Sequence, residues 1–154
     1  MTLKTSNTSN ILILGHSFVR RLHTFLTEHH DRRAALNMNL AHENVSFMGI
    51  GGRTVSKMLS FDLDKIKVFQ PKFIILELGT NDLCVVEQRP ESIDSDIEHL
   101  VQVFYDHCGA EFIMVCLVTY RCAIPPHVLD FRHRVDLLYK YLKLVLEPLP
   151  YAEA

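Results

Sequence analysis

Ser17 is the first residue of this chain whose type and position could do chemistry. It follows the apolar run at residues 11–14 and stands where a helical pattern of apolar residues begins. The free backbone amides and the dipole of a helix N-terminus favour developing negative charge, so a serine hydroxyl there is a candidate nucleophile. Serine is also a frequent helix N-cap without any chemistry, and taken alone Ser17 favours that structural role.

Two further segments offer hydrogen-bond donors for a substrate oxygen. Gly51 and Gly52 follow a second apolar run, and because they lack side chains they let backbone amides come close to a ligand. Asn81 follows a third run, and its side-chain amide is a type of donor that serves in oxyanion holes. Each segment also fits a plain turn, because glycine and asparagine are common turn residues.

Short apolar runs alternate with helix-period segments and predict where these residues lie. The predicted strands are residues 11–14, 45–50, 73–78 and 112–118, and the predicted helices begin near residues 17, 55, 92 and 128. This alternation favours one parallel sheet with right-handed crossovers and helices on both faces. A strand order of 2-1-3-4 places the ends of the first three strands side by side, at the edge where such sheets bind ligands.

Together the three segments resemble blocks I, II and III of the SGNH (GDSL-type) hydrolases. The matching residues are Ile13–Ser17, Gly51–Thr54 and Leu78–Asp82, in the family's order, and the resemblance covers residues 10–147. The Gly-His-Ser sequence of block I is similar to a divergent branch of that family. The resemblance implies a flavodoxin-like three-layer α/β/α domain that hydrolyses ester bonds without a cofactor.

The resemblance also assigns roles to individual residues. It implies that Ser17 is the nucleophile, and that the amides of Ser17 and Gly52 form an oxyanion hole with the side chain of Asn81. The implied substrate is a small acyl ester. His16 departs from the family pattern, which usually has aspartate before the serine.

A larger departure concerns the Asp-x-x-His segment that supplies the family's general base and the residue that orients it. Residues 148–154 contain no histidine and are too short for a strand and a loop, so we expect the family's fifth strand to be missing and the chain to be C-terminally truncated. The expected division is a disordered N-terminus at 1–9, the hydrolase-like domain at 10–147 and an irregular tail at 148–154. Because an unassisted serine is a weak nucleophile, we expect a weak or inactive serine esterase.

Three histidines are candidate substitutes for the base. His16 adjoins Ser17, but neighbouring residues at a strand end project in different directions. His127 and His133 follow the fourth predicted strand, and the sequence gives neither a position beside the serine. The alternative function is therefore a non-catalytic ligand-binding or protein-interaction module, in which the exposed edge of the fourth strand is available for self-association.

Other functions fit the sequence less well. The glycines at 49–52 do not match the dinucleotide fingerprint and follow the second strand instead of the first, and no metal-binding motif is present. A net charge of −2 does not favour nucleic-acid binding. We interpret the one basic cluster as the solvated face of a helix and the turn after it; it consists of Arg20, Arg21, His23, His29, His30, Arg32 and Arg33.

The composition is that of an ordinary folded domain, with 154 residues, 48% of them hydrophobic and 22% charged. Its four cysteines form no C-x-x-C pair, which favours reduced thiols over a disulfide framework. The polar N-terminus and the short apolar run after it fit neither a signal peptide nor a membrane span, so we expect a cytoplasmic protein.

Overall fold

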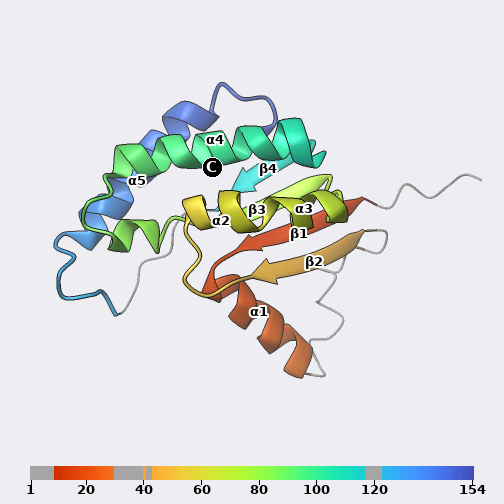
Figure 1. The fold of residues 1–154 in the computed structure, drawn as a ribbon, viewed down its shortest axis with the longest axis horizontal. Coiled ribbons are helices and arrows are strands. Elements are labelled where there is room, and N and C mark those ends of the chain that lie inside the picture. Colours follow the sequence, from red (N-terminus) through yellow and green to blue (C-terminus); the bar gives the residue numbers. More distant parts are fainter. Residues whose placement is uncertain (1–8, 30–39, 41–42, 117–122) are drawn as a thin grey trace, which may run out of the picture.

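The computed structural model describes residues 9–29, 40, 43–116 and 123–154. These residues form a five-stranded parallel sheet of order β2-β1-β3-β4-β5 (Figure 1). The strands are β1 (Asn10–Gly15), β2 (Asn44–Gly49), β3 (Phe73–Glu77), β4 (Phe112–Val115) and β5 (Ala152–Glu153). The helices are α1 (Ser17–Glu28), α2 (Val55–Phe61), α3 (Leu63–Phe69), the short 3-10 helix η2 (Asp82–Cys84), α4 (Pro90–Cys108) and α5 (Phe131–Leu146). The predicted three-layer α/β/α class and the 2-1-3-4 order are confirmed.

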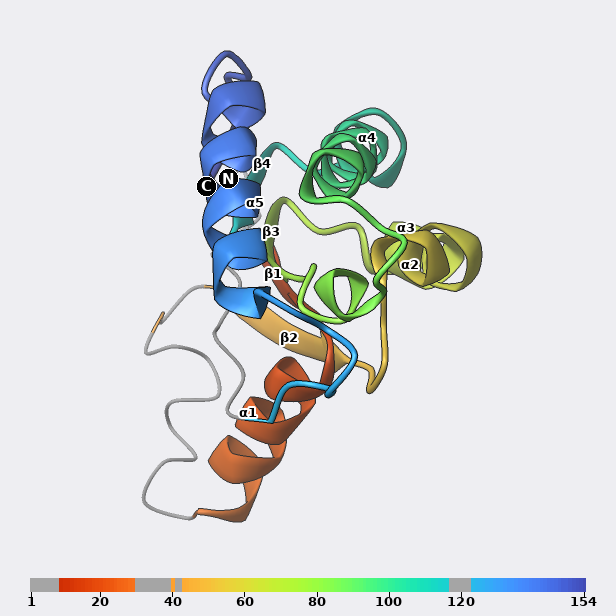
Figure 2. The same ribbon diagram turned by 90° about the vertical axis from the view of Figure 1, so that its left-hand side faces the viewer.

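Helices cover both faces of the sheet. Helix α1 packs on one face beside β2, while α2, α3 and α4 lie on the other face, as the view onto the carboxyl ends of the strands makes clear (Figure 2). Helix α5 packs against α4. The buried core consists of apolar side chains of the central strands and the facing helices, among them Leu12, Leu14, Ile74, Leu76, Ile97, Leu100, Phe104, Val135, Leu138 and Leu142. Burial of this apolar surface is the main term that holds the three layers together.

The strands are in a register that brings their carboxyl ends level. Gly15 at the end of β1 pairs with Gly49 of β2 on one side and with Glu77 of β3 on the other. The loops that follow these strands therefore start from the same edge of the sheet. Gly52 and Asn81 lie in these loops, and Ser17 begins the helix that follows β1.

Two glycines allow the close approach of chain segments at this edge. A Cβ atom at Gly15 would lie 2.3 Å from the carbonyl oxygen of Glu77, and a Cβ at Gly49 would lie 2.1 Å from the backbone nitrogen of Arg20. Both distances are far below van der Waals contact. Glycine at these positions is what lets the first turn of α1 rest directly on the ends of β1 and β2.

The expectation of a missing fifth strand is wrong. Ala152 and Glu153 pair in parallel with Ile113 and Met114 of β4, so the edge that we expected β4 to expose is covered over these residues. The eight residues after α5 suffice because only a short turn, residues 147–151, separates the end of this helix from β5. Tyr151 secures that turn by stacking on the ring of Tyr105 in α4, with ring centroids 3.9 Å apart.

Two predicted helices begin within three residues of the predicted positions. The helix predicted from residue 92 is α4, and the one predicted from 128 begins three residues later as α5. The pattern missed α3, which follows α2 after a single residue, and η2, whose three residues are too few to show a helical period. The predicted disordered N-terminus, except Ser9, lies outside the described residues, as do His30, Arg32, Arg33, Cys122 and the end of the fourth predicted strand at 117–118.

Candidate functional site

Ser17 occupies the first turn of α1 without capping it. The N-cap is His16, whose Nδ1 accepts a hydrogen bond of 3.2 Å from the backbone amide of Phe18. The prediction that Ser17 caps the helix, made from its residue type and position alone, is therefore wrong. Its hydroxyl is half-buried, and Oγ accepts a hydrogen bond of 3.2 Å from Nη1 of Arg21, one turn further along the helix.

His16 is held by a buried partner on the next strand. Its Nε2 lies 3.0 Å from Oε1 of Glu77, and the two residues are only 6% and 5% exposed. Because Nδ1 accepts from the Phe18 amide, the neutral ring carries its proton on Nε2, which faces the carboxyl group of Glu77. Both ring nitrogens are thus engaged away from Ser17. This contact also explains why β3 is apolar except for Glu77.

The glycine turn after β2 is exposed and has a left-handed residue. Gly52 has φ of +69°, a conformation that residues with a Cβ rarely adopt. The next residue, Arg53, anchors the turn through a bidentate ion pair with the fully buried Asp62, with Nε–Oδ2 at 2.8 Å and Nη2–Oδ1 at 2.9 Å. Burial raises the pKa of Asp62, and the Arg53 charge opposes that rise.

Asn81 connects the loop after β3 to this turn. Its side-chain nitrogen Nδ2 donates a 2.8 Å hydrogen bond to the carbonyl oxygen of Arg53. Asn81 makes no side-chain bond to η2, so it does not serve as a helix cap there. An amide nitrogen carries two hydrogens, and the second is left for another acceptor.

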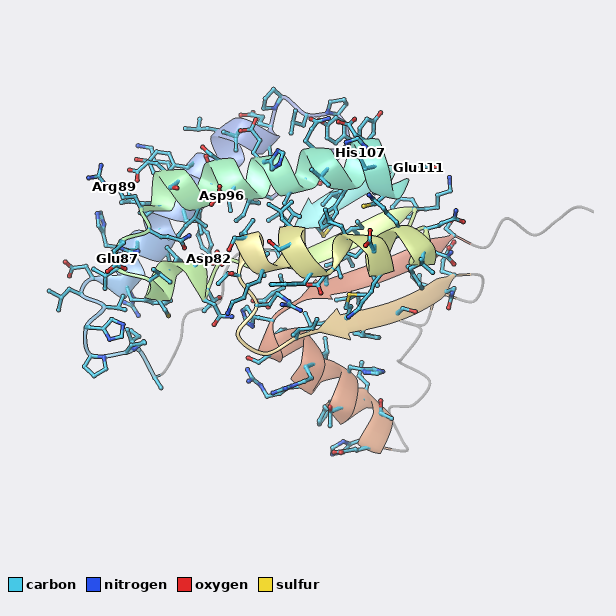
Figure 3. The ribbon with its side chains drawn as sticks, viewed as in Figure 1. Asp82, Glu87, Arg89, Asp96, His107 and Glu111 are labelled. Atoms are coloured by element: carbon cyan, nitrogen blue, oxygen red, sulfur yellow. The ribbon has the colours of Figure 1, made fainter. Side chains whose placement is uncertain are left out.

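Asp82 makes a second connection between the same two loops. Its Oδ1 accepts a 3.0 Å hydrogen bond from the backbone amide of Val55, the first residue of α2. Figure 3 shows Asp82 at the carboxyl edge of the sheet, near the start of α2. Asp82 is 1% exposed, and burial raises its pKa to about 6 although the Val55 bond works in the opposite direction.

The first loop is tied to the second as well. The backbone amide of Ile50 donates a 3.0 Å hydrogen bond to the carbonyl oxygen of Gly15. The guanidinium group of Arg20 lies against Gly51, with Nη1 3.4 Å from the position that a Cβ there would occupy. The structure thus brings the segments of Ser17, Gly52 and Asn81 to one edge and links them by backbone and side-chain hydrogen bonds.

The candidate substitutes for a base are not joined to the serine. Arg21 is the one side chain hydrogen-bonded to Ser17 Oγ within the described part of the chain. His127 precedes α5 and His133 lies in its first turn, and both are exposed. Sequence reasoning did not find the roles of Arg21, Asp62 and Asp82. The lone carboxylate in an apolar strand, Glu77, was the signal that could have pointed to the His16 pair.

Two cavities between described residues lie away from Ser17. One has a volume of about 400 Å³ and is lined by Phe112, Lys143, Glu147 and residues 152–154, beside β5. A second, of about 380 Å³, includes His107, which Figure 3 shows at the opposite end of the molecule from Asp82. No group of three or more histidine, cysteine or acidic side chains among the described residues is arranged to hold a metal ion. Within that part of the chain, no helix combines the length and apolar character needed to cross a bilayer.

Fold and site together define a parallel α/β/α domain with a serine at the turn from β1 to α1. Over residues 7–147 the chain matches the family model of GDSL-like lipases and acylhydrolases, and it belongs to that family. No curated protein sequence matches it. Among the described residues, Cys108 and Cys116 are free thiols.

Solved structures with the same fold include several ester hydrolases. A GDSL-like lipase from Parabacteroides merdae superposes with a TM-score of 0.70 at 16% identity, over 91% of this chain and 73% of that one. A catalytic mutant of an acetylxylan esterase from Geobacillus stearothermophilus gives 0.65 at 15% identity, over 94% and 75%. A lipase/acylhydrolase from Enterococcus faecalis gives 0.62 at 14% identity, over 93% and 80%. At these identities the likeness shows the shared fold.

Proposed function

We propose that this domain is a serine ester hydrolase in which the hydroxyl of Ser17 attacks the carbonyl carbon of a small acyl ester. The observation that carries the proposal is the capping of α1 by His16, because the serine hydroxyl at the helix N-terminus is then not used as the cap. The backbone amides of Ser17 and Gly52 and the second hydrogen of Asn81 Nδ2 would bind the oxyanion. Such donors act where negative charge develops in the transition state.

Attack by Ser17 forms a bond from Oγ to the carbonyl carbon, moves the C=O π electrons onto the oxyanion and requires the hydroxyl proton to leave. Collapse of the oxyanion then breaks the ester C–O bond and releases the alcohol, and water hydrolyses the acyl-serine. Arg21 stabilises negative charge on Oγ through its hydrogen bond. Its guanidinium group cannot accept the proton, because it is already fully protonated. Both nitrogens of His16 are engaged, and no base is hydrogen-bonded to Ser17 among the described residues, so we expect solvent to take the proton. We therefore expect slow turnover, since removal of a general base costs several orders of magnitude in rate.

A fluorophosphonate probe and a short-chain 4-nitrophenyl ester test this proposal. We expect covalent labelling and ester cleavage in the wild-type chain and neither in Ser17→Ala. Ser95→Ala is the matched control, because Ser95 is an exposed serine of α4 whose hydroxyl bonds only to its own helix. Equal labelling of the wild type and Ser17→Ala would show that this serine is not the nucleophile.

The second candidate function is a non-catalytic ligand-binding or interaction module. It is favoured by the engagement of His16 away from Ser17, which leaves the serine without an imidazole partner in the described part of the chain. Self-association would then use the short β5 strand, not β4, as the sheet edge. Analytical ultracentrifugation tests this candidate: a monomer across the accessible concentration range, together with active-site labelling, would count against it.

A further inference from the structure

Three cationic side chains from two helices border the proposed site. Arg21 donates to Ser17 Oγ, and the guanidinium of Arg20 lies 3.4 to 3.7 Å from the position of a Cβ at Gly51. Nζ of Lys57, in the first turn of α2, donates a 3.3 Å hydrogen bond to the carbonyl oxygen of Gly52. We call Arg20, Arg21 and Lys57 the basic rim. All three residues are exposed, and their contacts with Ser17, Gly51 and Gly52 place their charged groups beside the serine and the glycine turn.

No carboxylate neutralises the basic rim within the described part of the chain. The described residues form ion pairs between Arg53 and Asp62 and between Lys72 and Glu111, and His16 contacts Glu77. None of these contacts includes a member of the basic rim. Three acidic groups at this edge of the sheet have other partners. Glu77 faces His16, Asp62 binds Arg53, and Asp82 accepts the Val55 amide while burial raises its pKa to about 6. Among the described residues, the three cations of the basic rim therefore have no ion-pair partner, which favours an anionic ligand.

From this arrangement we infer that the ester attacked by Ser17 carries an anionic group, a carboxylate or a phosphate, which binds the basic rim. The inference rests on the proposed function and names its substrate class. A carbonyl carbon at Ser17 Oγ places the neighbouring substrate atoms beside Arg21 and within reach of Arg20. Arginine binds carboxylate and phosphate oxygens through paired N–H donors, so two guanidinium groups on one side of the nucleophile suit an anion.

The basic rim would also act before the substrate binds. Unneutralised cations around a site raise the rate at which anions reach it, and salt screens that attraction over about 10 Å at an ionic strength near 0.1 M. The competing interpretation is that Arg20 and Arg21 are simply the solvated face of α1. That interpretation predicts no difference between charged and neutral substrates.

Two pairs of matched esters separate these interpretations and show on which side of the ester the anion lies. The acyl-side pair is mono-4-nitrophenyl adipate and its methyl ester, and the alcohol-side pair is 4-acetoxybenzoate and its methyl ester. The measured quantity is the ratio of kcat/KM for the charged ester to that for the neutral one. Comparing this ratio between variants cancels the intrinsic reactivity of each ester.

We expect Arg20→Gln and Lys57→Gln each to lower the ratio in at least one pair by on the order of three- to fivefold, the range of an exposed charge pair. Lys140→Gln, an exposed lysine of α5, is the control and should leave the ratio unchanged. The wild-type ratio should also fall as sodium chloride is raised. The inference would be overturned if, for both ester pairs, the ratio stays the same in Arg20→Gln, in Lys57→Gln and at raised salt.

A binding measurement keeps the inference separate from the proposed hydrolysis. Ser17→Ala is titrated with monomethyl adipate and with inorganic phosphate by calorimetry, with and without the added Arg20→Gln change. Binding that weakens with Arg20→Gln supports the basic rim even when no ester is cleaved, in which case only the proposed hydrolysis fails. Absence of binding together with absence of a charge preference refutes the anionic substrate.

Discussion

Replacement of His16 by alanine tests the part of the structure that frees Ser17. The change removes the ring nitrogen that accepts the Phe18 amide at 3.2 Å, and loss of such an N-cap costs about 1 kcal/mol. It also removes the group 3.0 Å from Glu77, which is 5% exposed and would be left without a partner. An orphaned buried carboxylate costs about 3 kcal/mol, so His16→Ala should lower the free energy of unfolding by about 4 kcal/mol.

A double-mutant cycle separates the two contributions. Glu77→Gln keeps an oxygen that can accept from His16 Nε2, so alone it should cost only about 1 kcal/mol. In the background of His16→Ala the same change removes the orphaned charge, and the double variant should be more stable than His16→Ala by about 2 kcal/mol.

Urea unfolding followed by circular dichroism at neutral pH measures each free energy by linear extrapolation. Phe18→Ala is a useful control, because its backbone amide still reaches His16 and its half-exposed ring is outside the core. The reasoning is refuted if His16→Ala costs less than about 1 kcal/mol, or if the effects of the two substitutions simply add.

Three further predictions concern the loops at the carboxyl edge. Burial raises the pKa of Asp82 from 3.8 to about 6, so the wild type loses stability as pH rises through that window. Asp82→Asn keeps the Val55 hydrogen-bond acceptor and should be the more stable chain at pH 8, by up to about 3 kcal/mol, with the advantage vanishing below about pH 4 in urea titrations. A constant difference at all pH values would contradict the assignment. Gly49→Ala should fail to fold or unfold at a much lower temperature, because its Cβ would meet the Arg20 backbone at 2.1 Å, and a native melting curve would be evidence against this packing. Asn81→Ala should reduce kcat for a nitrophenyl ester by on the order of a hundredfold if its amide binds the oxyanion, and unchanged kcat would remove it from that role.

The candidate site could be located from sequence because its parts follow local patterns. Each of Ser17, Gly52 and Asn81 comes after an apolar run, and parallel strands connected by right-handed crossovers present their carboxyl ends at one edge. The roles of the side chains were less predictable. Ser17 and His16 are adjacent and both can cap a helix, and the choice between them depends on Glu77, which arrives from another strand.

The last strand, β5, could not be predicted from the sequence either. A two-residue strand has no periodicity to detect, and β5 exists because β4 offers it hydrogen bonds and because Tyr151 stacks on Tyr105 of α4. Two other contacts depend on the assembled sheet in the same way. Arg53 pairs with Asp62, and Asp82 accepts a hydrogen bond from the Val55 amide.

The sequence by itself determined the alternation of strands and helices, the class of sheet and the three segments at its carboxyl edge, because apolar periodicity and turn residues act over a few neighbouring positions. The tertiary structure decided which residue caps α1 and which carboxylates have a cationic or imidazole partner. It also left Arg20, Arg21 and Lys57 without an ion-pair partner among the described residues. These outcomes depend on distances between side chains from different elements, and those distances exist only once the layers have packed.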